Sequence, residues 1–298
     1  MGRLHSSPSP LHRGPMVGLL SITLAACKGG VLDPLGPVGR DDATILVNAT
    51  WIMLAIVIPT ILLAFWMAWH YRASNDKAEY LPYWSYSGRI EAVVWSIPTL
   101  TVMFIGGVIW TGSYQLDPFR PLRSDARTLQ VQVVSLDWKW LFIYPQQRVA
   151  SVNRLVVPAG RPVHFSITSG SVFNVFFVPR LGSMIYAMPG MVSELHLQAD
   201  EPAQLWGISA QYSGDGFSDM QFEVHSVATN EFDTWVASVR GKGAVLDRPA
   251  YAELTRPSQN VPPTAFGNID PHLFHAIATQ KIPPGPGPAP EPFPGGKD

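Results

Sequence analysis

The stretch Ser209-Ala210-Gln211-Tyr212-Ser213-Gly214-Asp215-Gly216-Phe217-Ser218-Asp219-Met220 lies between two short apolar segments in the C-terminal half of this 298-residue chain. The flanking segments, residues 204–209 and 220–225, have the length and the apolar content of strands. The two glycines favour a turn between them. The stretch therefore predicts, at the least, a Gly-rich surface turn that joins two strands.

Further short apolar or alternating runs precede this loop, separated by Pro and Gly turns such as Pro158-Ala159-Gly160. The candidate strands are residues 129–136, 139–143, 154–157, 163–168, 172–178, 193–198, 204–209 and 220–225. So many short strands within about a hundred residues predict a β-sandwich or barrel.

Two long uncharged runs precede the strands. Residues 43–71 and 92–116 contain no Asp, Glu, Lys or Arg, and only 14% of the whole chain is charged. A helical run of ~25 residues spans ~37 Å at 1.5 Å per residue, more than the ~30 Å hydrocarbon core of a bilayer. Pro59 and Pro98 lie near the middle of the runs, where each is expected to kink a helix. The two runs predict a transmembrane hairpin over residues 43–117.

The only cysteine of the chain, Cys27, follows a short apolar run that ends in Leu24-Ala25-Ala26. A basic start, a short apolar core and small residues are typical of an export signal. Leu-Ala-Ala-Cys also resembles the bacterial lipobox, in which the cysteine becomes the lipidated first residue of the mature protein. We expect residues 1–26 to be a lipoprotein signal peptide, Cys27 to be lipidated and residues 27–42 to form a periplasmic linker. The alternative, a Cys27 buried in a membrane anchor, needs a longer apolar run.

The C-terminal region changes from strand-like to helical patterns. Residues 229–239 have a cap-like start and apolar positions at helical spacing, and further helices are expected near residues 248–254 and 271–279. Residues 229–281 therefore predict a helical extension. From residue 282 onward Pro and Gly dominate, which predicts a disordered tail over residues 282–298.

Taken with the hairpin and the strands, the loop resembles that of subunit II of the haem-copper oxidases. There the pattern Cys-x-Glu-x-Cys-x-x-x-His-x-x-Met, with a histidine upstream in His-x-x-x-x-Pro, holds a binuclear copper centre that accepts electrons from cytochrome c. The spacing is retained in this chain, but only the methionine matches. The ligand positions are Asn174, Ser209, Gln211, Ser213, Phe217 and Met220.

The replacement removes the donors that copper needs. A hydroxyl, an amide or a phenyl ring does not substitute for thiolate and imidazole at a soft copper site, so we expect these positions to bind no metal. A subunit II without copper is typical of the quinol oxidases. The resemblance therefore implies subunit II of a cytochrome bo-type ubiquinol oxidase, with a cupredoxin-like Greek-key domain over residues 123–228 in a membrane-anchored α+β fold.

The same resemblance implies the partners and the location. It implies a proton-pumping enzyme of the bacterial inner membrane, with membrane lipid and quinol as partners and without cytochrome c, and it implies a large periplasmic domain for this chain. Subunit I is the main partner and carries the haems and the oxygen-site copper, and subunits III and IV complete the complex. This chain then binds no cofactor and carries no catalytic residue.

Glu91 lies at the start of the second uncharged run, at its cytoplasmic end. An ionisable group at the edge of a membrane span is a candidate for proton handling, and the resemblance implies a glutamate here at the entrance of a proton channel. The alternative is an interfacial carboxylate paired with Arg89.

Other aromatic and imidazole side chains receive structural interpretations. Residues 137–145 resemble the aromatic segment of subunit II, and without copper we expect Trp138 and Trp140 to be buried where the domain meets subunit I, with no part in electron transfer. His164, His196 and His225 occur singly on different candidate strands, which predicts ordinary polar histidines.

Two alternative functions remain open from the sequence. One is a cytochrome c oxidase subunit II with an atypical metal site, which needs ligands that the sequence does not supply. The other is a membrane-tethered binding or assembly module outside any oxidase. A nucleic-acid partner is excluded because the formal net charge is −1.

Overall fold

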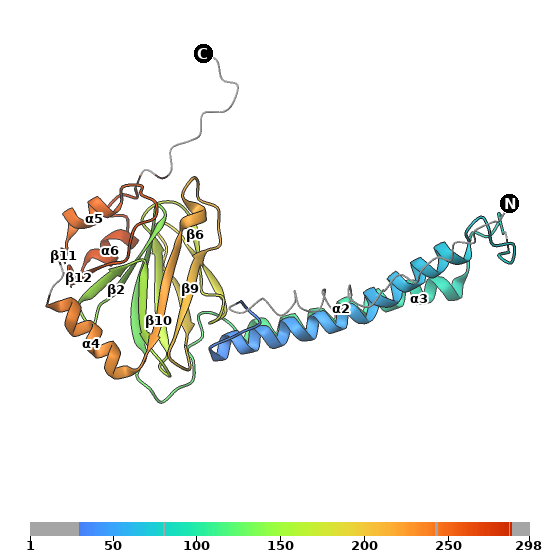
Figure 1. Ribbon diagram of the computed structural model, residues 1–298, viewed down its shortest axis with the longest axis horizontal. Helices are drawn as coiled ribbons and strands as arrows, with labels where there is room; N and C mark the ends of the chain where they lie inside the picture. The colour runs from blue at the N-terminus through green and yellow to red at the C-terminus, as the bar shows by residue number, and fades with distance from the viewer. Residues whose placement is uncertain (1–29, 80, 242–243, 286, 288–298) are drawn as a thin grey trace, which may run out of the picture.

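The computed structural model describes residues 30–79, 81–241, 244–285 and 287. A long two-helix hairpin is joined at one end to a β-rich domain (Figure 1). The predicted signal peptide, Cys27 and residues 288–298 of the predicted tail lie outside the described residues.

The hairpin consists of α2 (Pro37–His70) and α3 (Gly88–Gln115), which are 34 and 28 residues long. Both helices are apolar and long enough to cross a membrane, since they extend for ~51 and ~42 Å at 1.5 Å per residue. α2 begins at Pro37, so the prediction of a linker over residues 27–42 is wrong for residues 37–42. Proline suits the first helical position because its φ is preset and its missing N–H has no helical partner there.

The described strands form two sheets. One has the order β11-β12-β3-β2-β1-β5-β8 and the other the order β4-β10-β9-β6-β7. Most pairs are antiparallel, but β1–β5, β4–β10 and β11–β12 are parallel. The strands are β1 (Leu129–Leu136), β2 (Lys139–Tyr144), β3 (Val149–Val152), β4 (Arg154–Pro158), β5 (Val163–Ser169), β6 (Asn174–Phe177), β7 (Met184–Ala187), β8 (Ser193–Leu197), β9 (Ala203–Ser209), β10 (Gln221–Val227), β11 (Ala244–Leu246) and β12 (Thr264–Ile269).

All eight predicted strands are present with small shifts at their ends, and the prediction of a β-sandwich or barrel is confirmed. The sequence pattern does not reveal β3, β7, β11 or β12. The first three of these have only three or four residues, too few to show a period of two, and β12 carries a glycine and an asparagine.

A cluster of aromatic rings fills the space between the sheets. Trp140 and Phe142 on β2 meet Phe176 on β6 and Phe222 on β10, and all four side chains are buried. The ring centroids of Trp140 and Phe176 are 5.5 Å apart and those of Phe142 and Phe222 are 5.1 Å apart, which suits edge or tilted contacts. Gly207 leaves room for this cluster, because a Cβ there would lie 1.9 Å from Cζ of Phe222.

One hydroxyl group ties the two sheets together. Tyr144 on β2 donates a hydrogen bond to the carbonyl oxygen of Val156 on β4 at 3.0 Å and accepts one from the Val156 N–H at 2.8 Å. Burial raises the pKa of Tyr144 well above its ordinary value, so the phenol keeps its proton for this contact.

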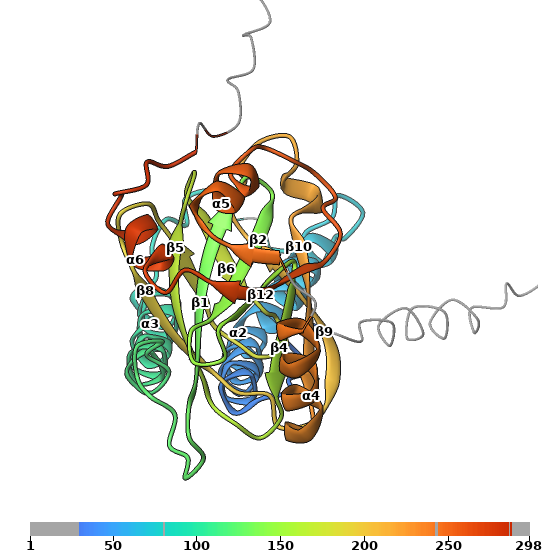
Figure 2. The same cartoon turned by 90° about the vertical axis from the view of Figure 1, so that its left-hand side faces the viewer.

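The C-terminal extension packs on two sides of the β-domain: α4 packs against the core between the sheets, and α5 and α6 cover the outer face of the seven-stranded sheet. It comprises α4 (Thr229–Arg240), β11, α5 (Arg248–Leu254), β12 and α6 (Leu273–Ala278). β12 pairs with β3 and β11 pairs with β12, so the predicted helices are present and the extension also adds two strands to the sheet. Figure 2 shows α4, α5 and α6 on the face that points away from the hairpin.

The start of the predicted tail is held against the domain. The Ile282 N–H donates to the Ala276 carbonyl at 3.1 Å, and the Gly285 N–H donates to the Gly170 carbonyl at 2.7 Å. Ile282 also packs on the apolar cluster beneath α5 and α6. The prediction of disorder from residue 282 is therefore wrong for residues 282–285, because local Pro and Gly content did not reveal these contacts.

The residues that immediately precede α2 dock onto the β-domain. The Leu35 N–H donates to the Arg180 carbonyl at 2.7 Å, and the Asp200 N–H donates to the Leu35 carbonyl at 2.9 Å. Gly36 allows this approach, since a Cβ at Gly36 would lie 2.0 Å from the carbonyl oxygen of Gln198. The end of the hairpin at which α2 begins is thus fixed to the domain by backbone contacts.

Candidate functional site

The loop between β9 and β10 is closed at its base by the strands themselves. β9 and β10 are antiparallel, and the Ser209 N–H donates to the Met220 carbonyl at 3.1 Å. A short 3-10 helix, η2 (Phe217–Asp219), forms the second half of the loop. The predicted turn between two strands is therefore present.

The structure brings the upstream position and the loop together. The Ser209 hydroxyl donates a hydrogen bond to Oδ1 of Asn174 at 2.8 Å, which joins β9 to β6. Asn174, Ser209, Ser213 and Met220 are buried. This juxtaposition of residues 35 positions apart is what the resemblance to a ligand loop requires.

The other two predicted positions are less enclosed. Gln211 is exposed, and Phe217 is half-buried with its ring 5.7 Å from that of Tyr212 in an edge contact. These two side chains therefore lie at the outer side of the loop.

The donor set does not fit a binuclear copper centre. Asn174 offers an amide and Ser209 and Ser213 offer hydroxyls, none of which is a soft donor. The Asn174 amide nitrogen and the Ser213 hydroxyl are buried without a hydrogen-bond partner in the described structure. An amide nitrogen is a donor of hydrogen bonds and not a metal ligand, so these unpaired atoms do not supply the missing thiolate and imidazole.

Trp138 supports the loop from the β1–β2 turn. Its Nε1–H donates to the Ser213 carbonyl at 3.0 Å, and its ring lies so close to Gly216 that a Cβ there would be 2.4 Å from the ring. Trp138 itself has φ of 60°, the left-handed region that non-glycine residues rarely adopt. Trp138 and Trp140 are buried within this chain alone, so the expectation that they are buried against subunit I is wrong.

Two ionisable side chains next to Trp138 were not recognised from the sequence. Asp137 and Lys139 are both buried, and the Ser171 hydroxyl donates to the Asp137 carboxylate. Burial raises the pKa of Asp137 and lowers the pKa of Lys139. The Lys139 ammonium donates to the Arg256 carbonyl at 2.7 Å, so it fastens the C-terminal extension to the sheet.

Glu91 lies in the first turn of α3, and α3 begins at the end of the hairpin away from the β-domain (Figure 1). Its side chain is exposed in this single chain. Arg89 is exposed too, and the described structure contains no ion pair between these two residues.

The histidines are less isolated than their sequence positions indicate. His164 on β5 and His196 on β8 are register partners, and their rings stack with centroids 4.5 Å apart. His225 lies 3.1 Å from the Glu223 carboxylate. Within residues 30–79, 81–241, 244–285 and 287, no group of three or more His, Cys, Asp or Glu side chains is placed to hold a metal ion.

Comparisons with known proteins identify two family regions. Residues 100–227 match the family described as cytochrome c oxidase subunit II, periplasmic domain, and residues 240–285 match the COX aromatic rich motif. The first match confirms the predicted cupredoxin-like class of the β-domain. The periplasmic domain of subunit II of the Bradyrhizobium japonicum cytochrome oxidase aligns with a TM-score of 0.38 at 22% identity, over 41% of this chain and 98% of that one.

Curated relatives match most of the chain. The cytochrome bo(3) ubiquinol oxidase subunit 2 of Pseudomonas aeruginosa is 48% identical over 260 residues, which are 87% of this chain and 78% of that protein. The ubiquinol oxidase subunit 2 of Acetobacter aceti is 48% identical over 262 residues, 87% of this chain and 85% of that protein.

Proposed function

The chain belongs to the subunit 2 family of the cytochrome bo(3)-type ubiquinol oxidases, and we propose that it serves an enzyme that oxidises ubiquinol and reduces oxygen to water. The observation that carries this proposal is the donor set at the loop, where the geometry of a ligand loop is kept without thiolate or imidazole. The relatives at 48% identity favour this function over an atypical cytochrome c oxidase and over a free-standing assembly module.

In this proposal the chain carries no electrons and no catalytic residue. A copper centre in subunit II is the entry point for electrons from a soluble donor, whereas quinol dissolves in the membrane and reaches subunit I directly. Subunit I holds the haems and the oxygen-site copper, and subunits III and IV complete a proton-pumping complex. The chain then acts as a scaffold on subunit I.

The surface available for subunit I combines the hairpin with one edge of the β-domain. β7 is an edge strand of the five-stranded sheet, and it exposes Met184 and Tyr186. The Tyr186 ring packs at 5.0 Å against Phe173, which is also partly exposed. Exposed aromatic and Met side chains are enriched at protein interfaces, so we assign this edge to the contact with subunit I.

Glu91 is proposed to feed protons into subunit I. The supporting observations are its place at the mouth of a membrane-spanning helix and the exposure of its side chain in the single chain. The absence of an ion pair with Arg89 in the described structure leaves both carboxylate oxygens available to a proton path.

Cys27 is proposed to be lipidated after removal of residues 1–26. Lipidation fixes the orientation, because an outer-face Cys27 places the turn between α2 and α3 in the cytoplasm and the β-domain in the periplasm of a bacterial inner membrane. Mass spectrometry of the intact subunit tests this: a diacylated Cys27 at the N-terminus is expected, and a free thiol or an uncleaved Met1 contradicts it.

The choice of electron donor, ubiquinol or reduced cytochrome c, tests the proposed function. The purified complex is expected to consume oxygen with ubiquinol and to show no consumption above background with reduced cytochrome c. Oxygen consumption with cytochrome c at a comparable rate would instead require electrons to enter through this chain, and the proposal would be wrong.

A further inference from the structure

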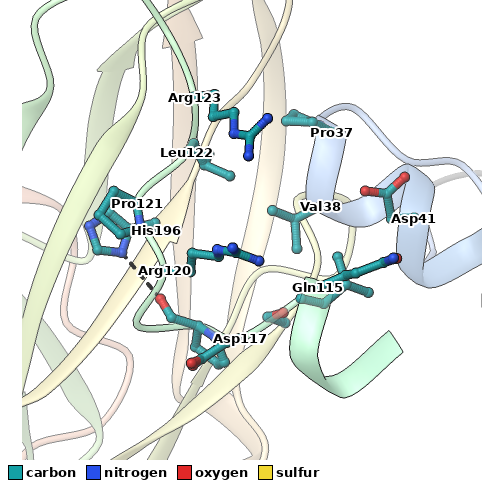
Figure 3. Close-up of a pocket in the computed structure, with 13 residues that line it drawn as sticks. Pro37, Val38, Asp41, Gln115, Asp117, Arg120, Pro121, Leu122, Arg123 and His196 are labelled. Carbon is teal, nitrogen blue, oxygen red and sulfur yellow. Dashed lines mark hydrogen bonds between the residues drawn. The ribbon is translucent and has the colours of Figure 1, made fainter. Parts of the chain in front are cut away.

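The junction between the hairpin and the β-domain contains a cavity of about 380 Å³ (Figure 3). The first turns of α2, the end of α3 and the connection from α3 to β1 provide most of its lining. Apart from His196, the ionisable residues in its lining are two acidic and two basic ones, Asp41, Asp117, Arg120 and Arg123, so their formal charges cancel. Because the uncharged runs begin at residue 43 and end at residue 116, this cavity lies at a boundary of the membrane, which is the outer surface in the orientation proposed above, on which this inference rests.

The two arginines of the cavity have few partners of their own. Figure 3 shows Arg120 and Arg123 extending from the connection toward the first turn of α2. Neither takes part in an ion pair in the described parts of the chain, and Arg120 reaches only the Tyr114 carbonyl, at 3.5 Å. Guanidinium groups bind phosphate oxygens through paired hydrogen bonds, and the N-terminal end of α2 favours an anion nearby.

An apolar groove adjoins this cavity in the membrane-spanning part. It has a volume of about 500 Å³ and is lined by Ile45 of α2 and by one face of α3, including Met103, Gly107 and Gly112. Gln115 lines both the cavity and the groove. From Met103 to Gln115 the groove is ~18 Å long, close to the ~15 Å depth of one leaflet.

We propose that the cavity and the groove together bind one phospholipid of the outer leaflet with a phosphoethanolamine headgroup. The phosphate lies on Arg120 and Arg123, the ammonium group faces Asp41 and Asp117, and an acyl chain follows the groove along α3. A lining with no net charge matches a zwitterionic headgroup better than an anionic one. A primary ammonium also donates hydrogen bonds to carboxylates, which a quaternary ammonium cannot do.

The test uses the purified oxidase complex and measures the phospholipid that remains bound after extensive detergent washing, by solvent extraction and mass spectrometry. Two variants address the two halves of the site: the double variant Arg120→Gln with Arg123→Gln, and Gly107→Leu. Gly106→Leu is the matched control, because a Cβ at Gly106 or at Gly107 meets no atom within 4 Å, yet only Gly107 lines the groove.

Wild type and Gly106→Leu are expected to retain a phosphatidylethanolamine molecule that both site variants lose while remaining assembled. In vesicles, phosphatidylethanolamine is expected to raise the melting temperature of the delipidated wild-type complex, and phosphatidylglycerol is not. Equal retained phospholipid in all four complexes would overturn the proposal, since the groove would then be filled by a partner helix or by an acyl chain on Cys27. Equal stabilisation by both lipids would overturn the assignment of the headgroup.

Discussion

Restoring the missing donors tests whether the loop retains the backbone geometry of a copper site. The design keeps Met220 and applies Asn174→His, Ser209→Cys, Gln211→Glu, Ser213→Cys and Phe217→His. The soluble fragment should span residues 123–285, because β12 pairs with β3 and Lys139 binds the Arg256 carbonyl, so a fragment that ends after β10 would expose the sheet.

The structure allows the cost in the absence of metal to be worked out. Asn174 is fully buried, so a larger imidazole overpacks its site at about 1–3 kcal/mol. The change at Ser209 removes its hydrogen bond to Asn174, worth about 1 kcal/mol. The change at Phe217 removes the edge contact with Tyr212, worth about 0.5–1.5 kcal/mol. We expect the metal-free fragment to be about 3–5 kcal/mol less stable than the parent.

Copper should recover most of this loss. A ligand at a thousandfold excess over its Kd stabilises the folded state by about 4.1 kcal/mol, which corresponds to a rise of about 8–16 °C in Tm for a domain of this size. The assay is a thermal melt with and without copper, together with copper analysis and the visible absorption spectrum. We expect a coloured fragment with two coppers bound. The matched control carries the other four substitutions but retains Ser213. It lacks one thiolate, so it should bind less copper and show little colour. A designed fragment that folds but stays colourless and free of copper would show that the loop geometry differs from that of a ligand loop.

Three further predictions concern the proton path, the tie between the sheets and the stacked histidines. Glu91→Gln should slow oxygen reduction in fully assembled enzyme and Glu91→Asp should slow it less, whereas wild-type turnover in Glu91→Gln across neutral pH would exclude a proton role. Tyr144→Phe leaves the buried N–H of Val156 unpaired and should lower the free energy of unfolding of the 123–285 fragment by about 1–3 kcal/mol in urea titrations; an unchanged value would refute the tie. Burial and the neighbouring His196 lower the pKa of His164, so the unfolded chain binds this proton more tightly and stability should fall as the pH drops through 6.5. His164→Gln should weaken this pH dependence of the free energy of unfolding. An identical pH dependence in the wild type and the variant would contradict a role of His164.

The strands and helices with enough residues to show a period could be predicted from the sequence. The transmembrane hairpin, the eight predicted strands and the helix α4 (Thr229–Arg240) were visible in this way. The spacing from Ser209 to Met220 also located the loop, because a loop between two consecutive antiparallel strands is local in sequence.

Contacts between distant segments could not be predicted in the same way. The pairing of His164 with His196 depends on β5 lying beside β8, and the burial of Lys139 depends on Arg256 more than a hundred residues later. The start of α2 at Pro37 depends on the docking of Leu35 onto the domain. The local composition around each of these residues does not indicate its distant partner, so only the tertiary structure identifies these contacts.

The copper content and the electron paramagnetic resonance spectrum of the purified oxidase complex test the central claim most directly. Because the loop offers hydroxyl, amide and phenyl groups in place of thiolate and imidazole, we predict only the copper of the oxygen-reducing site and no mixed-valence signal. Additional copper in the complex, accompanied by a mixed-valence binuclear signal that is lost on substitution of Ser209 or Asn174, would contradict it.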